Sequence, residues 1–395
     1  MAEYLVIGRQ PENRLAVTPT RVRVARFGRG ASLEDSATQA ENRLEGSGIF
    51  KWYRDVARKR DPLAQRKGRP HPFGAAPLEL TGQQAAELRK KFPDAALIRN
   101  ARVHLIRSAR VLGTVTGAVA TADLWHLDRI GVLPLRLRTG LGATVAVVDT
   151  GVQTGHPEFA ALPQPIESFG FHPDTGAAIA AGPDTAAHGT HIAGLICGRT
   201  CGVAPGAKLI NIKVFGSVAP TLRALLAALT FVAAHPEIDI VNLSLGITDR
   251  ERALGAVIGD LLFHGILPVC AVGNAGAGRA ESPGDFDGAM TVGFTNKLGM
   301  VETNSGSKTV MANGVGFDVP DLVAPGAQVV SARAGGGFEQ RSGSSMAAAI
   351  VSGLAALQVE QNPSIGADAL ASSLLANVVP VAGLSVRSGH GFAVV

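Results

Sequence analysis

The sequence is poor in several kinds of residue. Only 5% of its 395 residues are aromatic, 17% are charged, and three are cysteine. Cys197, Cys201 and Cys270 are too few and too odd in number to form a disulfide framework. The charged fraction lies below the roughly 25% that soluble domains average. Because 46% of the residues are hydrophobic, the chain can bury a large core, which excludes wholesale disorder.

Long hydrophobic runs are also missing. No stretch of about 18 apolar residues occurs, so we expect no membrane span. The N-terminal apolar run, Tyr4–Ile7, is short and has no basic lead, unlike a secretory signal. The sequence therefore predicts a cytoplasmic protein.

Charge is unevenly divided along the chain. Residues 1–110 hold 22 Lys/Arg and 11 Asp/Glu, a net charge of +11, and residues 111–395 hold the other 15 and 21, a net charge of −6. A basic segment can bind an outside polyanion. Two parts of opposite sign can also bind each other.

From about Leu124 onward, apolar β-branched runs alternate with helical patterns. We expect strands at 144–148, 209–215, 238–245, 266–272 and 290–294, and helices at 221–234 and 250–263. Near-continuous apolar strands separated by helices indicate a parallel sheet with helices on both faces. We therefore predict an α/β domain with a three-layer parallel sheet over residues 122–395.

Residues 1–110 have the pattern of a small α+β unit. Its expected elements are strands at 4–7, 22–27 and 96–106, the last with a break near Asn100, and a helix at 81–92 between a Thr start and Pro93. Small residues and glycines dominate 108–121. We therefore predict a linker or cleavage junction at 111–121.

Three polar residues stand where strands end or helices begin. Asp149 ends the run ATVAVVD, His188 opens a helix in DTAAHGTHIAG, and Ser345 opens a helix just after Gly343. In parallel sheets such positions meet at one edge. Each alone has an ordinary interpretation as a turn residue or helix cap. Together they supply the orienting acid, the base and the nucleophile of a catalytic triad.

The helix starts suit these roles. A histidine at a helix N-terminus is disfavoured as a cation, so His188 would rest neutral and act as a base. A serine at a helix start has a free backbone N–H beside it, which can stabilise an anion. His191 lies one turn after His188 and is interpreted as structural, since no third metal ligand is evident.

The chain order Asp, His, Ser and the residues around each resemble the subtilisin-like serine peptidases, or subtilases. VVDTG, HGTHIAG and GSSMA are similar to the family's three boxes, and the further segments GVAPGAKL, VNLSLG, AVGNAG and DLVAPG follow in the family's order. The resemblance runs from about Leu124 to the C-terminus. It implies a subtilisin-like fold and an endopeptidase that acts on protein or peptide substrates through Asp149, His188 and Ser345.

The resemblance also implies an oxyanion hole and a substrate cleft. Asn274, after an expected buried strand, would donate its side-chain amide to the oxyanion together with the Ser345 backbone N–H. An extended peptide would add to the end of a strand. The walls of the primary specificity pocket in this cleft would be formed by Ser244, Leu245 and Gly246 on one side and by Ala271 and Gly273 on the other. Glu281, Asp285 and Asp287 follow, and an acid that reaches this pocket would favour basic side chains, although such clusters are more often solvated loops.

Two departures from the family pattern stand out. Ala349 and Ile350 replace the Pro and the common His that follow the serine box. The family's best-known calcium loop, inserted between the His188 helix and Val203, is missing, and no acidic loop of the D-x-D type occurs elsewhere. The sequence thus predicts no metal site and no cofactor, with calcium left open.

Residues 1–110 loosely resemble the N-terminal propeptide of many subtilases, which assists folding and inhibits the enzyme. Opposite net charges would favour this intramolecular propeptide docking on the enzyme. We expect self-cleavage between about Leu105 and Thr121.

Three alternatives remain. A catalytically silent, subtilase-like peptide-binding protein would keep the fold without the reaction. The basic stretch 51–69 could be a nucleic-acid arm, but no recognised nucleic-acid motif accompanies it, so nucleic acid is not the expected partner. The third alternative is a nucleotide-binding α/β domain, but no phosphate-loop fingerprint follows the first strand.

Overall fold

A computed structural model describes residues 2–7, 75–93, 96–106, 110–115, 118–133, 137–248, 250–312, 314–381 and 385–395. The expected strand at 22–27 and the basic stretch 51–69 lie outside these residues. None of the helices in the described ranges is long and apolar enough to cross a membrane.

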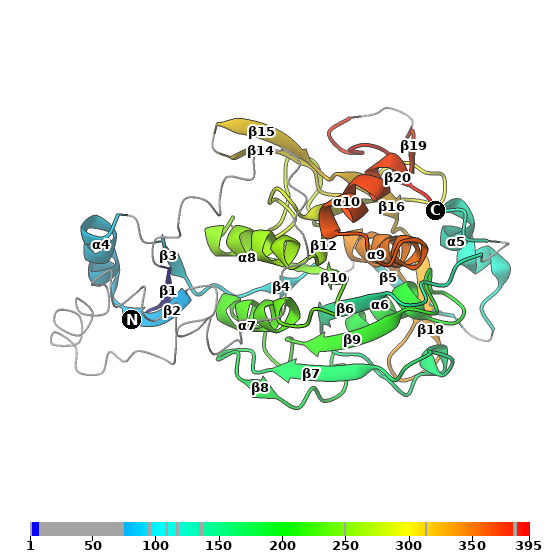
Figure 1. Cartoon of the computed structure of the whole chain (residues 1–395), viewed down its shortest axis with the longest axis horizontal. Coiled ribbons are helices and arrows are strands. Elements are labelled where there is room, and N and C mark those ends of the chain that lie inside the picture. The colour runs from blue at the N-terminus through cyan, green and yellow to red at the C-terminus, as the bar shows by residue number, and fades with distance from the viewer. Residues whose placement is uncertain are drawn as a thin grey trace.

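A ten-stranded sheet forms the centre of the larger part of the described chain (Figure 1). Its inner strands run parallel, and antiparallel pairs close both ends. In spatial order the strands are β19 (Val378–Val379), β20 (Phe392–Ala393), β16 (Leu322–Pro325), β13 (Met290–Thr295), β12 (Leu267–Ala271), β10 (Ile240–Leu243), β6 (Thr144–Asp149), β9 (Lys208–Lys213), β7 (Glu167–Phe171) and β8 (Ala178–Ile179). The expected strands are therefore confirmed.

Helices cover both faces of this sheet. The strands β6, β10 and β12 are therefore buried along their whole length. On one face, α6 (His188–Cys197), α9 (Ser344–Gln361) and α10 (Ala367–Ala376) share one hydrophobic cluster with the sheet. On the other face, α7 (Leu222–Ala233) and α8 (Arg252–Phe263) share a second cluster. This three-layer α/β arrangement confirms the predicted fold.

Several shorter elements lie around this sheet and its helices. They are a hairpin of β14 (Lys308–Ala312) and β15 (Val315–Val319), the helix α5 (Trp125–Arg129), and the 3₁₀ turns η3 (Thr121–Leu124) and η4 (Pro157–Phe159).

The N-terminal unit is a small antiparallel sheet with one helix. The strands β1 (Ala2–Ile7), β2 (Ala75–Leu80) and β3 (Ala96–Arg99) pair in the order β2-β1-β3, and α4 (Gly82–Lys91) joins β2 to β3. At the start of α4 the Thr81 hydroxyl accepts from Gln84 N at 3.2 Å, while Gln84 Oε1 accepts from Thr81 N at 2.8 Å. This reciprocal cap explains why the helix begins at the expected residue. The strand β2 was not foreseen.

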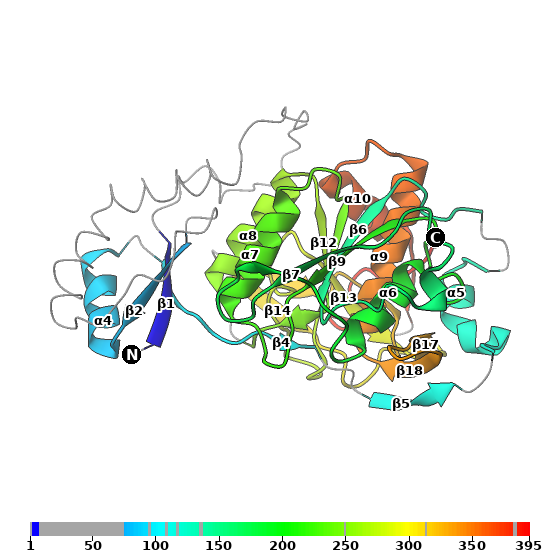
Figure 2. The same ribbon diagram turned by 90° about the horizontal axis from the view of Figure 1, so that it is seen from below.

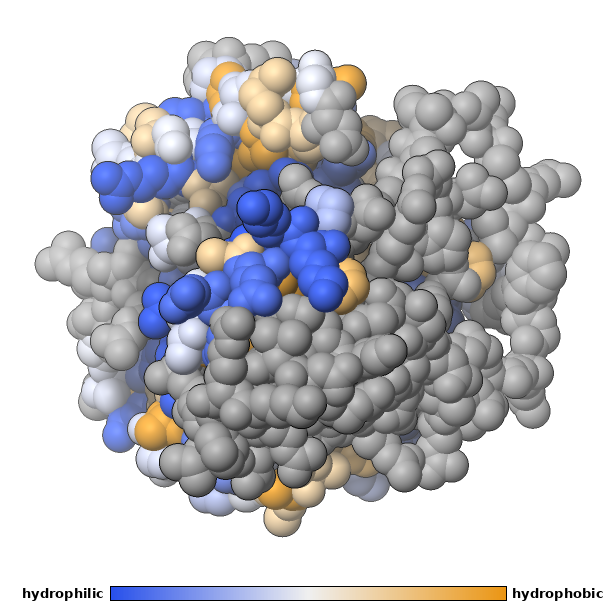
Figure 3. Space-filling model, turned by 90° about the vertical axis from the view of Figure 1, so that its left-hand side faces the viewer, coloured by the Kyte–Doolittle hydropathy of each residue, from blue (hydrophilic) through white to orange (hydrophobic). Residues whose placement is uncertain are grey.

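The small unit lies beside α7 and α8 in both ribbon views (Figures 1 and 2). Leu5, Ile98 and Val103 belong to the same hydrophobic cluster as those two helices. Its outer end, which carries α4, has a hydrophilic described surface (Figure 3). The unit therefore buries its apolar side against the larger part.

Two short strands carry the chain from the small unit along the larger part. β4 (His104–Leu105) pairs antiparallel with β11 (Leu245–Gly246). Residues 110–115, which we had assigned to the end of the small unit and a linker, instead form the strand β5 (Arg110–Val115). β5 pairs antiparallel with β18 (Phe338–Ser342), which itself pairs with β17 (Val329–Ala332). This strand was not foreseen, because its partner strand is more than 200 positions away in sequence.

Candidate active site

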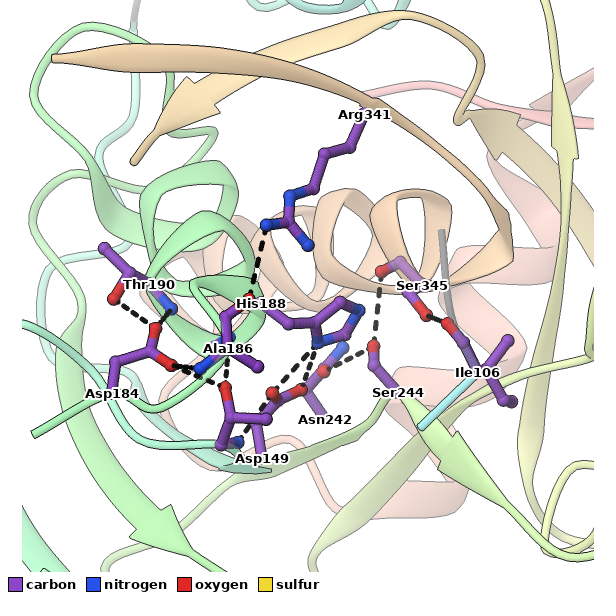
Figure 4. A network of polar contacts seen from close by, with 12 residues as sticks. Ile106, Asp149, Asp184, Ala186, His188, Thr190, Asn242, Ser244, Arg341 and Ser345 are labelled. Carbon is purple, nitrogen blue, oxygen red and sulfur yellow. Dashed lines mark hydrogen bonds and ion pairs between the residues drawn. The ribbon is translucent and has the colours of Figure 1, made fainter. Parts of the chain in front are cut away.

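Asp149 and His188 form a buried pair at the carboxyl end of β6. His188 Nδ1 lies 2.9 Å from each carboxylate oxygen of Asp149 and donates to them (Figure 4). Both side chains are almost fully shielded from solvent. The Thr150 backbone N–H donates to Asp149 Oδ1 at 2.7 Å, which fixes the carboxylate from its other side. The acid thus orients the ring and leaves Nε2 pointing away from it.

A close approach of α6 to β6 makes this pair possible. A side chain at Gly189 would clash with the Gly151 carbonyl oxygen and would lie 3.2 Å from Asp149 Cβ. The preceding residue, Ala187, has a φ of 56°, in the left-handed region that costs a non-glycine residue free energy. Gly189 and this turn place His188 at the first position of α6, as the sequence predicts.

Asp184, which the sequence analysis missed, holds the loop before α6. Its carboxylate accepts from Thr190 N at 2.9 Å, from Ala186 N at 3.0 Å and from Thr150 Oγ1 at 2.8 Å. The Asp184 side chain therefore ties the start of α6 to the end of β6 (Figure 4). A turn-forming Asp four residues before His188 was the available signal, but it does not identify these partners.

His191 is buried one turn after His188 and is held by neighbouring backbone. Its Nε2 lies 3.3 Å from Glu339 O, and its own carbonyl accepts from Ser331 Oγ at 2.8 Å. Burial, and then the nearby Arg341 guanidinium, lowers the pKa of His191 well below its usual value. These contacts favour the structural interpretation of this residue.

Ser345 lies in the first turn of α9, directly against the chain of the small unit. Its Oγ donates to the carbonyl oxygen of Ile106 at 2.8 Å (Figure 4). His188 Nε2 is buried and has no hydrogen-bond partner in the part of the chain that the structure describes. A peptide carbonyl is thus seated on the serine hydroxyl, and a ring nitrogen able to accept a proton is left over in the same site.

Asn274 lies beside the start of α9, next to the serine. Its Oδ1 accepts from Ser344 N at 2.9 Å and from Ser344 Oγ at 3.0 Å. A Cβ on Gly343 would lie 2.8 Å from Asn274 Nδ2, so only glycine gives this amide its space. The contacts orient the amide with Nδ2 away from Ser344.

The predicted cleft residues divide into two groups. Ser244, Leu245 and Gly246 contact the segment at 104–106: Ile106 N donates to Ser244 O at 3.3 Å, and Leu245 and Gly246 pair with Leu105 and His104. Ala271 and Gly273, which were predicted for the opposite wall, pair with no residue of this segment in the described ladders. Gly273 instead borders Glu281, since a Cβ there would lie 3.1 Å from Glu281 Cγ.

The three acids that follow the predicted pocket walls differ in their burial and in their contacts. Asp285 is buried and accepts from Ser282 Oγ at 2.5 Å, with the Arg250 Nε 3.8 Å away. Burial raises the pKa of Asp285 above its usual value. Asp287 is exposed. Glu281 alone reaches the chain in the cleft, where its Oε2 lies 2.9 Å from His104 Nε2.

The short connection after α6 is closed by a carboxylate. Glu158 Oε2 accepts from Thr200 N at 2.9 Å and from Cys201 N at 3.1 Å. The cysteines Cys197, Cys201 and Cys270 are buried, and none of them forms a disulfide in the described chain. Within the described ranges, no three or more His, Cys, Asp or Glu side chains gather as metal ligands do.

Comparison with known proteins identifies the family of the larger part. The family model described as "Subtilase family" matches residues 140–391. The M-protease of Shouchella clausii is 32% identical over 255 residues, which cover 61% of this chain and 60% of that protein. This chain thus spans about three fifths of the length of that relative.

Solved structures give the same picture. A cold-adapted subtilisin-like serine proteinase superposes with a TM-score of 0.54 at 29% identity, covering 68% of this chain and 95% of its own. Fervidolysin from Fervidobacterium pennivorans, a keratinolytic enzyme related to subtilisin, has a TM-score of 0.66 at 18% identity. It covers 100% of this chain with 60% of its own and shows a common fold.

Proposed function

The chain belongs to the subtilase family, and from this premise we propose that it is a serine endopeptidase made as a self-processing precursor. The observation that supports the proposal most is the seating of the Ile106 carbonyl on Ser345 Oγ, 2.8 Å away, beside the buried Asp149–His188 pair. A nucleophile, a base and a substrate carbonyl occur together there.

The proposed reaction is acyl transfer. Ser345 Oγ attacks the scissile carbonyl carbon and gives its proton to His188 Nε2. The His188 imidazolium then protonates the leaving amine. Asp149 holds the ring in the tautomer with a proton on Nδ1 and stabilises its charged form. Water then attacks the acyl group on Ser345 Oγ, with His188 again as the base, and releases the acid product.

The negative charge that develops on the carbonyl oxygen needs donors. Asn274 Nδ2 and the Ser345 backbone N–H are the proposed pair. Because Ser344 fixes Asn274 Oδ1, the amide is oriented before substrate arrives. Replacing Asn274 with Ala should lower kcat by about 10²–10³-fold, the size measured for such a donor in subtilisin.

The proposed substrates are protein or peptide segments bound in extended form. The antiparallel pairing of His104 and Leu105 with Gly246 and Leu245 serves as the pattern, since strand addition depends on backbone hydrogen bonds. Ile106 marks the residue whose carbonyl is attacked. The small unit and its tail act as the intramolecular inhibitor.

Self-cleavage is proposed at the bond between Ile106 and Arg107, which narrows the sequence-based window of Leu105 to Thr121. Intact-mass analysis of the purified chain tests it. Wild type should yield two polypeptides, residues 1–106 and 107–395, and Ser345→Ala should remain one chain. Cleavage in Ser345→Ala, or cleavage at another bond, would contradict the assignment.

The competing function is a catalytically silent peptide-binding protein with the same fold. Labelling with a serine-reactive fluorophosphonate separates the two, because reaction requires an activated Ser345. The processed chain should be labelled at Ser345 and His188→Ala should not. Equal labelling of both, or of neither, would favour the binding protein.

A further inference from the structure

The Glu281 side chain borders both Gly246 and Gly273, which were predicted to lie on opposite walls. Its backbone N–H donates to Val272 O at 3.0 Å, and the next residue, Ser282, exchanges two backbone hydrogen bonds with Ile247. A Cβ on Gly246 would lie 2.6 Å from Glu281 Oε2, and Gly273 borders the same side chain. Both walls therefore lack side chains where the glutamate passes, and the backbone fixes its position.

The carboxylate faces one side of the bound segment. Along an extended strand alternate side chains share a face, so His104 and Ile106 point the same way and Leu105 points the other. Glu281 Oε2 meets His104 Nε2 at 2.9 Å, and the exposed fractions of the two side chains are 18% and 43%. The contact is thus partly open to solvent, so a longer side chain at this position can reach the carboxylate.

We propose that Glu281 selects a cationic side chain at the position that His104 holds, the second residue before the one whose carbonyl is attacked. The inference rests on the proposed peptidase function and adds a substrate class to it: segments that carry Arg or Lys there. The imidazole of His104 meets the same carboxylate but is charged only when protonated, so it is a weak member of this class.

The surroundings leave this carboxylate as the acid that meets the segment. Asp285 is buried against Ser282 and Arg250. Asp287 is exposed, and it is not part of the pairing between β4 and β11. A guanidinium or ammonium group keeps its charge at every working pH, and charge-assisted hydrogen bonds to a carboxylate are stronger than neutral ones. Partial exposure limits the gain through solvent screening.

The first test measures peptide cleavage by the self-processed protein. Fluorogenic peptides of the form Val-X-Leu-Ile, with X as Arg, Lys, Gln or Glu, report kcat/KM. We expect Arg and Lys to exceed Gln by about tenfold, with Glu the poorest. Glu281→Gln should remove the preference, and Asp287→Asn, a nearby acid, should keep it. Absence of the preference in wild type, or its survival in Glu281→Gln, overturns the proposal.

The second test does not require catalysis. In full-length Ser345→Ala, hydrogen exchange reports how tightly residues 103–106 are held. His104→Arg should slow exchange there about tenfold, and adding Glu281→Gln should erase the gain. An unchanged rate, or equal slowing with Glu281→Gln, overturns the proposal. If no peptide is cleaved by any variant, the peptidase function fails while this arm still decides the recognition.

Discussion

The small N-terminal unit and the larger three-layer part are built on different principles. The larger part buries a sheet between helices on both faces and carries two extensive hydrophobic clusters. In the described chain the small unit has three strands and one helix, and Leu5 and Ile98 find their cluster on α7 and α8 of its neighbour. A three-stranded sheet with one helix can build only a small core of its own. The small unit is therefore completed by the part that it covers.

The contacts between the two regions are mostly apolar or made by backbone. Opposite net charges predicted electrostatic docking, and the described ion pairs that join the regions are Arg102–Asp174 at 2.6 Å and His104–Glu281. Arg102 and Asp174 are largely exposed, so their pair contributes little, and His104 pairs as a cation only when it is protonated. The seating of the tail in the cleft and the burial of Val103 account better for the specificity of the fit.

The largest expected effect separates catalysis from docking. Asp149→Asn should lower kcat by about 10⁴-fold, because the His188 ring loses its oriented tautomer. The small unit touches neither group, so its contacts should be unchanged. Kinetics on a peptide amide measure the loss, and hydrogen exchange of β1 and β3 serves as the control. A large change in that exchange would mean that the two regions are coupled through the triad.

The second effect acts on docking alone. Val103 is fully buried and donates its N–H to Pro220 O at 2.8 Å. Val103→Asp would bury an unpaired charge and should weaken the seating of the tail by about 10²–10³-fold. Fluorophosphonate labelling of Ser345 in the full chain should then speed up. Val103→Ala is the matched control and should change the rate far less; equal rates for both variants would show that the tail does not cover the serine.

A smaller effect is expected where the small unit completes a helix. Asn100 Oδ1 accepts from Arg223 N at 2.9 Å and Ala101 O accepts from Leu222 N at 2.8 Å, so both satisfy donors at the start of α7. Asn100→Ala should destabilise the full chain by about 1 kcal/mol, as for the loss of a helix cap. Denaturant unfolding measures it, with Asn362→Ala as a comparison at the end of α9. A larger loss at Asn362 would contradict this view of the interface.

The smallest effect should be confined to the larger part. Burial raises the pKa of Asp321 to about 7, opposed by the Thr291 N–H at 2.6 Å. Between the usual pKa near 3.9 and about 7, the folded state holds a proton that the unfolded state has released, so stability falls as pH rises through this window. Asp321→Asn should flatten that slope. Melting temperatures from pH 4 to 8 measure it, and an unaltered slope would assign the pH dependence elsewhere.

Local patterns allowed much of the fold and site to be predicted. Strands such as β6 and the helix starts at His188 and Ser344 follow from apolar runs and turn residues that are contiguous in sequence. What depended on distant partners was missed. β5 and β2 are strands because they pair with β18 and β1, and their own sequences do not have a strand pattern. Likewise, three acids were flagged near the cleft, and only the folded backbone decides that Glu281 reaches it.

The pairing of β5 with β18 bears on the chemical balance of self-cleavage. Arg110 lies opposite Ser342 in this pairing. Ser342 precedes Ser345 by three residues, and Arg110 follows Ile106 by four residues. Once the proposed bond breaks, the amine of Arg107 stays tethered to this strand instead of diffusing away. A tether this short holds a group at an effective concentration of about millimolar or more. The amine therefore competes with water for the acyl group on Ser345. Until β5 separates from β18, re-formation of the peptide bond opposes hydrolysis of the acyl-enzyme.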